Sequence, residues 1–226
     1  MSLNARKVPH SGGDYKPAPA MDAGAYPARL VRIMSVGLQP QRPYQGEEKP
    51  PRHEVDWTYE FLDEFLQDDD GNDILDKPRW MSESLPHYSL ENTKAKSTAR
   101  YYALDPDEEA GGDLTKLIGK PVLINITKNI IKNGPNKGKE TNYISGTSTM
   151  RAKEAEKAPQ LVNPAVVFDI DEPDMEVFNK LPKFMQEKMT EKNLEFPNSA
   201  LDKAINGDGA GKSKAPEPEA DSDEDW

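Results

Sequence analysis

The sequence contains no cysteine, which excludes a disulfide framework and any thiolate ligand or nucleophile. Its three histidines, His10, His53 and His87, are too scattered along the chain to form a metal-binding motif. Apolar stretches as long as a membrane span, about 18 to 20 residues, are absent, and the N-terminus lacks the apolar core of a secretory signal. These absences predict a soluble protein of a reducing, cytoplasmic compartment, without a metal or a cofactor.

The composition is too polar for the whole chain to form one compact globule. Hydrophobic residues make up 35% of the 226 residues, the mean hydropathy is −0.85, and there are 20 prolines. We therefore expect one ordered domain of about 120 to 150 residues, with extended segments beside it. Because no nucleophile, base and orienting group occur together, the sequence predicts a protein that is not an enzyme.

Both ends of the chain lack the pattern of a folded core. Residues 1–26 are rich in Pro, Gly, Ala and Ser without an apolar period, which predicts a flexible N-terminal arm. Residues 206–226 pass from Gly, Ala, Lys and Pro into acidic residues, which predicts a disordered linker and an acidic tail. Order is expected in between, as a domain over residues 27–152 and an extension over residues 153–205.

The expected domain is mainly β. The clearest strand has Val55, Trp57, Tyr59 and Phe61 at period two, so that four large side chains share one face and the polar residues between them share the other. Other strands are expected at residues 29–38, 74–85, 121–127 and 141–149, with a short helix at residues 93–104. Five strands with a helix between the third and fourth predict an OB-fold barrel. A β-sandwich is the alternative, although it normally needs more strands.

The extension is expected to be helical. Apolar residues recur at roughly helical spacing through residues 173–192, and Pro182 should split or kink the helix. We expect this stripe to pack against the barrel through short helices, rather than to bind a partner. Its members are Met175, Phe178, Leu181, Phe184, Met185 and Met189.

The hairpin predicted around residues 132–139 is strongly basic. Residues 120–153 carry a net charge of +6, in a chain whose formal net charge is −11. Such a concentration of positive charge on an acidic protein is typical of a surface that binds a phosphate backbone. The alternative is an edge hairpin whose lysines only keep it soluble.

Aromatic residues lie among the basic ones in the expected domain. Proteins that bind single strands stack bases on aromatic rings and neutralise phosphates with Lys and Arg. We expect Val55, Trp57, Tyr59 and Phe61 to fill the barrel instead. The residues predicted to contact nucleic acid are Arg29, Arg32, Arg79, Trp80, Lys94, Lys96, Arg100, Tyr101, Lys120, Lys128, Lys132, Lys137, Lys139, Tyr143 and Arg151.

The chain ends in six acidic residues, uninterrupted by a cation, followed by Trp226. A terminal aromatic ring beside a carboxylate is a compact docking element for a cationic pocket. The tail Asp221-Ser222-Asp223-Glu224-Asp225-Trp226, together with Lys77-Pro78-Arg79-Trp80 and Leu117-Ile118-Gly119-Lys120-Pro121, resembles the single-stranded DNA-binding proteins of tailed bacteriophages, an OB-fold family. Bacterial members usually end in Phe after an Ile-Pro pair, whereas here Trp follows Asp.

The resemblance implies sequence-independent binding of single-stranded DNA in phage replication or recombination, within the bacterial host cytoplasm. It also implies that Asp221, Asp223, Glu224, Asp225 and Trp226 recruit phage or host replication proteins. Duplex DNA is a second ligand that a basic groove could bind, and the sequence specifies no oligomeric state. Two alternatives stay open: an acidic DNA mimic that inhibits a host DNA-processing enzyme, and a minor virion component.

Overall fold

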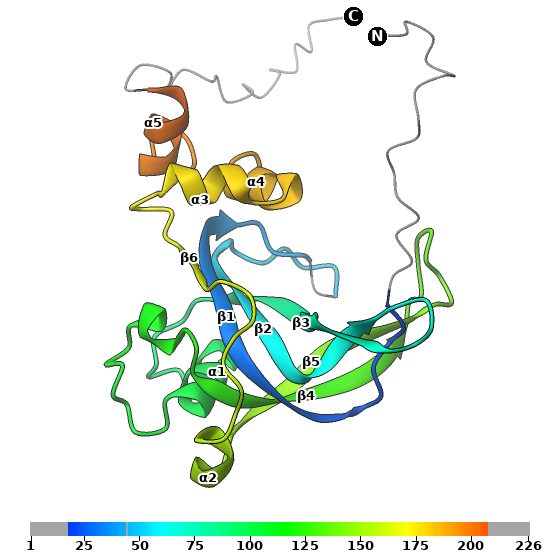
Figure 1. Cartoon of the computed structure of the whole chain (residues 1–226). Helices are drawn as coiled ribbons and strands as arrows, with labels where there is room; N and C mark the ends of the chain where they lie inside the picture. The colour runs from blue at the N-terminus through cyan, green and yellow to red at the C-terminus, as the bar shows by residue number, and fades with distance from the viewer. Residues whose placement is uncertain (1–17, 44, 208–226) are drawn as a thin grey trace, which may run out of the picture.

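The computed structural model describes residues 18–43 and 45–207, which form a mainly β structure with a cluster of short helices at one end (Figure 1). The strands are β1 (Gly24–Gln39), β2 (Arg52–Gln67), β3 (Asp73–Pro86), β4 (Pro121–Ile130), β5 (Glu140–Thr149) and β6 (Val166–Phe168). The helices are α1 (Lys96–Leu104), the 3₁₀ turn η2 (Leu114–Leu117), α2 (Ala152–Ala155), α3 (Met175–Lys180), α4 (Lys183–Met189) and α5 (Ala200–Asn206).

All six strands belong to one sheet, in the order β3-β2-β1-β4-β5, with β6 also paired to β1. Five strands are antiparallel to their neighbours, whereas β6 runs parallel to β1. The long strand β1 pairs with β4 through residues 24–29 and with β6 through residues 32–34. The structure thus corrects the expected count of five strands. It also does not confirm a closed barrel, because no strand pairing joins β3 to β5 in the part of the chain described.

The main core lies on the inner face of the curved sheet. As the alternation in β2 predicts, Trp57, Tyr59 and Phe61 are fully buried there. They pack with residues from β1 and β4 and with Tyr101 and Leu104 of α1, the helix between β3 and β4. Helix α1 contacts β3, β4 and β5, and so lies across the unpaired side of the sheet.

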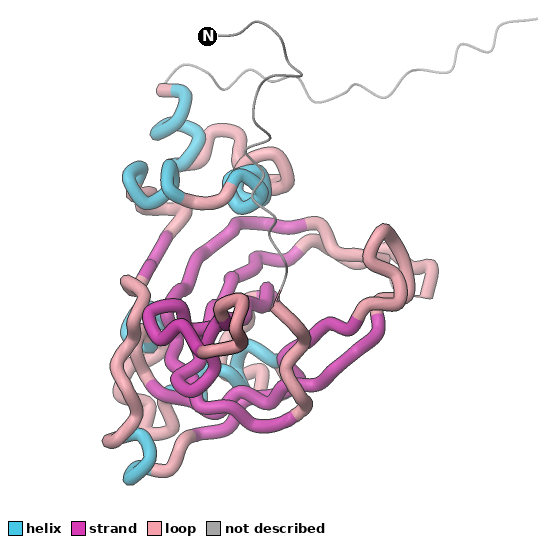
Figure 2. Tube along the Cα trace, turned by 45° about the vertical axis from the view of Figure 1, so that its right-hand side comes forward, coloured by secondary structure: helices cyan, strands magenta, loops and turns pink. Residues whose placement is uncertain are grey.

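A second apolar cluster joins the C-terminal helices to β1. Met34 and Val36 pack with apolar residues of α3, α4 and α5. Helices α3 and α4 are separated at Leu181 and Pro182, where the sequence predicts a break. Figures 1 and 2 show these helices as one group beyond the end of β1. The expected packing of the apolar stripe against the sheet is therefore present, with the exception of Phe184 described below.

One glycine allows the C-terminal segment to approach β1 closely. Gly37 has a φ of 77°, and a Cβ atom there would lie 2.4 Å from the side chain of Asn193. Asn193 Oδ1 accepts a hydrogen bond from the Leu38 backbone at 2.9 Å, and the Leu194 amide donates to the Leu38 carbonyl at 3.0 Å. A side chain at position 37 would break this contact, because it would be both strained and blocked.

The first described residues connect the two edges of the sheet. Arg79 of β3 donates to the Pro19 carbonyl at 2.7 Å, and Asn142 of β5 exchanges two hydrogen bonds with the Met21 backbone at 2.7 and 2.8 Å. Strand β1 begins at Gly24, before the boundary predicted for the flexible arm. Residues 1–17 of that arm, and residues 208–226 of the linker and tail, lie outside the described residues.

Candidate nucleic-acid interface

The outer face of β1, β2 and β3 presents three rows of side chains, each row crossing the three strands. A β-bulge between Leu30 and Arg32 shifts the register of β1, which places Arg29 and Arg32 on the same face. By register, the rows are Arg29, Glu60 and Trp80; then Arg32, Thr58 and Ser82; then Met34, Asp56 and Ser84. Different segments cover the first and third rows, and the middle row lies between them.

Arg29 and Glu60 of the first row are covered by residues 158–163, which we call the outer-face strap, whereas Trp80 is exposed. The carboxylate of Glu60, 1% exposed, accepts hydrogen bonds from the backbone of Val162 at 2.7 Å and of Asn163 at 3.0 Å. Asn163 Nδ2 donates a third at 2.6 Å. Arg29 donates to the carbonyl oxygens of Ala158 at 3.0 Å and Pro159 at 2.6 Å. The strap therefore satisfies one buried anion and one buried cation through main-chain groups.

The third row is covered by α4. Met34 packs in the second apolar cluster with Met185 and Met189. The ammonium group of Lys188 lies 2.9 Å from Asp56 Oδ1, 2.6 Å from Ser84 Oγ and 3.3 Å from Glu54 Oε2. Helix α4 is thus held by the apolar contacts of Met185 and Met189 and by the ammonium group of Lys188, which bonds to side chains of β2 and β3.

The middle row is left between these two covers. Arg32 donates from Nε to Thr58 Oγ1 at 3.2 Å, and its guanidinium carbon lies 5.4 Å from the centre of the Trp80 ring. Burial lowers the pKa of Arg32, and Asp56 partly offsets this effect. An arginine side chain is not deprotonated in proteins near neutral pH, so Arg32 stays charged. The ring of Trp80 is 54% exposed. Arg32 of the middle row thus lies against the accessible indole ring of Trp80 in the neighbouring row.

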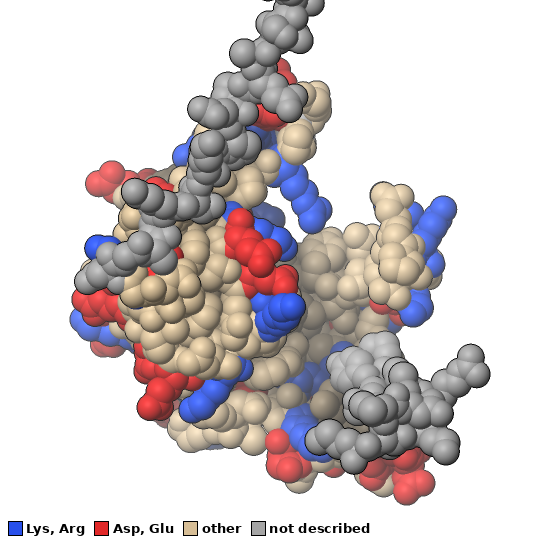
Figure 3. All heavy atoms as spheres, turned by 90° about the horizontal axis from the view of Figure 1, so that it is seen from above, with Lys and Arg blue, Asp and Glu red and all other residues tan. Residues whose placement is uncertain are grey.

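Two adjoining cavities follow this row toward α4. The first, of about 220 Å³, is lined by Arg32, Thr58 and Ser82 on the sheet and by Phe184, Met185 and Lys188 on α4. The second, of about 670 Å³, continues past Phe184 and Lys188 to Arg42 and Lys192. We call this continuous depression the outer-face groove; Trp80 does not line it but contacts Arg32, which does. Figure 3 shows a hollow beside the helical cluster with Lys and Arg atoms along its margins.

The acids of the outer-face groove are already paired. Glu54 and Asp56 both contact Lys188, as described above, and Glu83, which also lines the smaller cavity, pairs with Arg100. Within the described residues, no carboxylate forms an ion pair with Arg42 or Lys192, which are both exposed. The groove thus offers cations and a hydroxyl-lined floor, and an anionic ligand would meet little repulsion.

The β4–β5 hairpin supplies further exposed cations and rings. Lys132, Lys137 and Lys139 lie exposed at its tip, and Tyr143 is 47% exposed on β5. Lys128, in contrast, is paired with Asp22 at 2.9 Å and with Glu140 at 3.5 Å. Figure 1 shows the hairpin tip and the β1–β2 connection projecting on the same side of the molecule.

The side chains of three predicted contact residues are buried in the structure. Arg29 is bonded to the strap. Arg100, on α1, donates to Glu83 on the inner side of the sheet. Tyr101, 1% exposed, donates its hydroxyl to Asp105 at 2.9 Å and accepts from the Gly112 amide at 2.8 Å. A residue whose polar groups are satisfied inside the protein is not available to a nucleic acid.

Other predicted contacts are scattered. Lys120 pairs with the buried carboxylate of Asp105, so its charge is already compensated. Lys94, Lys96 and Arg151 are exposed but do not line the outer-face groove. Of the predicted set, the structure gathers Arg32 and Trp80 at the groove, and Lys132, Lys137, Lys139 and Tyr143 on the hairpin.

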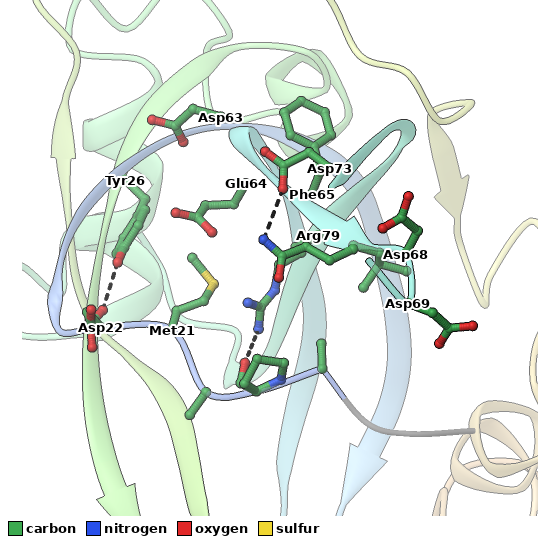
Figure 4. Close-up of a pocket in the computed structure, with 15 residues that line it drawn as sticks. Met21, Asp22, Tyr26, Asp63, Glu64, Phe65, Asp68, Asp69, Asp73 and Arg79 are labelled. Carbon is green, nitrogen blue, oxygen red and sulfur yellow. Dashed lines mark hydrogen bonds between the residues drawn. The ribbon is translucent and has the colours of Figure 1, made fainter. Parts of the chain in front are cut away.

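Arg79 belongs to a different, acidic cavity of about 650 Å³ at the β2–β3 hairpin (Figure 4). Burial is the main cause that raises the pKa of Glu64, and burial also raises the pKa of Asp63. A phosphate backbone would be repelled here, because one arginine faces six carboxylates. These belong to Asp22, Asp63, Glu64, Asp68, Asp69 and Asp73.

Sequence reasoning missed the part of the outer-face groove that α4 and the β1–β2 connection provide. Phe184 was expected in the core because it continues the apolar stripe, yet it is 64% exposed. One signal was available: Phe184 directly precedes Met185, and adjacent helical positions point about 100° apart, so both could not face β1. The predicted partner-binding residues Asp221 to Trp226 lie outside the described residues.

Comparison with protein-family models, with curated proteins and with solved structures finds no match. Within residues 18–43 and 45–207, no cluster of His, Asp or Glu side chains is arranged to hold a metal ion. In the same described ranges, none of the helices has the length and apolar character to cross a membrane.

Proposed function

We propose that this protein binds single-stranded DNA without sequence preference and without catalysing a reaction, in phage DNA replication or recombination. The observation that carries the proposal is the pair of Arg32, which lines the open groove, and Trp80 beside it, with a guanidinium lying over an accessible indole ring. Single-strand binding combines aromatic platforms for bases with cations for the backbone, and both are present here.

The topology supports the same proposal. The strand order β3-β2-β1-β4-β5, with a helix between β3 and β4, is the order of an OB-fold that is left open between β3 and β5. OB-folds bind oligonucleotides on the face of strands 2 and 3, between the β1–β2 and β4–β5 loops. In this chain the outer-face groove crosses β2 and β3, and the two corresponding loops project on one side.

The acidic tail completes the proposal. Asp221, Asp223, Glu224, Asp225 and Trp226 would recruit phage or host replication proteins, as the sequence motif suggests. The alternative function is an acidic DNA mimic that inhibits a host DNA-processing enzyme, and the acidic cavity at the β2–β3 hairpin favours it. The two functions differ in one measurable property, because a mimic would itself bind no DNA.

The experiment is a fluorescence titration with an oligodeoxythymidylate and with duplex DNA, at two salt concentrations. Trp80→Ala should weaken single-strand binding by about 5- to 150-fold, the loss expected for one stacked base. Leu75→Ala is the matched control, because Leu75 is an exposed apolar side chain of β3 outside the groove. Absence of DNA binding by the unmodified protein would refute the proposal and leave the DNA mimic.

A further inference from the structure

The smaller cavity of the outer-face groove lies at a step between the bare sheet and α4. Its floor is the middle row, where Thr58 and Ser82 hydrogen-bond to each other at 2.8 Å. Helix α4 covers the neighbouring row, so Phe184, Met185 and Lys188 form the wall of the step. The cavity is therefore built by two segments more than 100 residues apart in the sequence.

Phe184 forms this wall because α4 is anchored by other residues. Met185 and Met189 are buried against β1, and Lys188 is held by Asp56 and Ser84. This anchoring fixes the rotation of the helix and leaves Phe184 64% exposed, lining both cavities of the groove. The backbone of Phe184 is thus held in place, while its ring remains accessible to a ligand.

Arg32 lines the same cavity from the sheet. Its guanidinium is restrained by the hydrogen bond to Thr58 and by the contact with the Trp80 ring. A planar guanidinium held in this way is a stacking surface for a nucleobase, as an aromatic ring is. The cavity therefore has one stacking group on the sheet and another on α4.

The size and lining of the cavity suit one base. A volume of about 220 Å³ lies below the range of about 300 to 1,000 Å³ that is typical of drug-sized ligands. Thr58 and Ser82 share one hydrogen bond, which leaves one hydroxyl proton and further lone pairs between them, so this pair can meet donors or acceptors on a base edge. The adjoining cavity places Arg42 and Lys192 where a continuing backbone would need cations.

We infer that the smaller cavity is a subsite for one unstacked nucleobase of a DNA single strand, and that Phe184 is a stacking residue of this subsite. The inference rests on the proposed function and deepens it. It makes the C-terminal helices part of the binding surface, because α4 supplies one wall of the subsite. Residues 27–152 alone would hold only half of it.

The test compares binding of an oligodeoxythymidylate by the full chain and by Phe184 variants. Phe184→Ala should weaken binding by about 5- to 150-fold, and Phe184→Tyr should retain it. Phe184→Leu should also weaken binding. Because Leu keeps an apolar side chain at this position, a loss of affinity in this variant is not explained by a loss of stability. Leu194→Ala is the control, because Leu194 is an exposed apolar residue of the same segment that does not line the groove.

An abasic oligomer of the same length provides the second measurement. Because it has phosphates but no bases, the unmodified protein and Phe184→Ala should bind it equally. A double-mutant cycle of Phe184→Ala with Arg32→Ala should show coupling, since both residues contact one base. If Trp80→Ala weakens binding and Phe184→Ala does not, the subsite is wrong while the proposed function stands. If the unmodified protein binds no DNA, both fail.

Discussion

Arg100 and Glu83 form a two-point ion pair inside the sheet, with Arg100 Nε 2.7 Å from Oε1 and Nη2 3.1 Å from Oε2 of Glu83. Both side chains are largely buried, at 4% and 14% exposure. The pair joins α1 to β3 beneath the sheet face that carries the outer-face groove. A residue that sequence pattern assigns to DNA binding is thus part of the folded interior.

Arg100→Met should therefore affect stability rather than DNA binding. Loss of the guanidinium leaves Glu83 buried without its partner, which typically costs about 3 to 5 kcal/mol. Urea unfolding should show this loss, while DNA affinity per folded molecule should stay unchanged. A specific loss of affinity with stability intact would return Arg100 to the nucleic-acid interface.

The lysines at the tip of the β4–β5 hairpin should contribute to the salt dependence of binding. The affinity for a single strand falls with salt by a slope of about 0.7 per neutralised phosphate. Changing Lys132, Lys137 and Lys139 together to Gln should reduce the slope of log K against log[salt] by up to about 2. A triple Gln variant at the exposed Lys116, Lys180 and Lys203 is the matched control. Equal slopes for both variants would remove the hairpin from the interface.

Glu64→Gln should stabilise the protein near neutral pH. The pKa of Glu64 is raised above its ordinary value of 4.5, mainly by burial, so the folded state binds the proton more tightly than the unfolded state. The free energy of unfolding consequently falls as the pH rises from 4.5 through the raised pKa. The variant lacks this loss, so its advantage should shrink as the pH is lowered toward 4.5. Urea unfolding at several pH values measures it, with the exposed Glu47→Gln as control; identical pH profiles would contradict this assignment.

Deletion of residues 217–226 should tighten DNA binding at low salt. The segment carries six negative charges, and it lies outside the described residues. A tethered anion competes with DNA for cations at high effective concentration, and salt screens this competition. Trp226→Ala keeps the charges, so it should leave DNA affinity unchanged but abolish docking of a replication partner. Equal affinity of the deleted and full chains at low salt would exclude the competition.

The local sequence pattern was sufficient to predict which side chains of β2 lie on the inner face of the sheet. The alternation of large and polar residues in β2 correctly predicts that Trp57, Tyr59 and Phe61 face one core. It also separates Glu60 from them, but it carries no information about the strap that covers Glu60. That contact joins residues more than 100 positions apart, and neither partner has a periodic signature.

The groove residues show where sequence pattern fails. Trp80 and Tyr101 both stand beside basic residues in the sequence, yet the first is exposed and the second is buried by α1 packing. The bulge that brings Arg32 onto the face of Arg29 shifts a register by one residue, which composition does not reveal. Phe184 continues a helical stripe, and only the rotation of α4 decides that its ring is exposed.

The outer-face strap limits how evolution could recombine this protein. Arg29 and Glu60 depend on main-chain groups of residues 158–163, and β6 completes the edge of β1. A gene exchange that joined residues 27–152 to a foreign C-terminal segment would remove the main-chain partners of Glu60 and leave Arg29 with only the Gly119 carbonyl. Residues 27–152 and residues 153–205 should therefore be inherited together as one unit. We therefore expect natural exchange of segments with other proteins to be confined to residues outside 18–207.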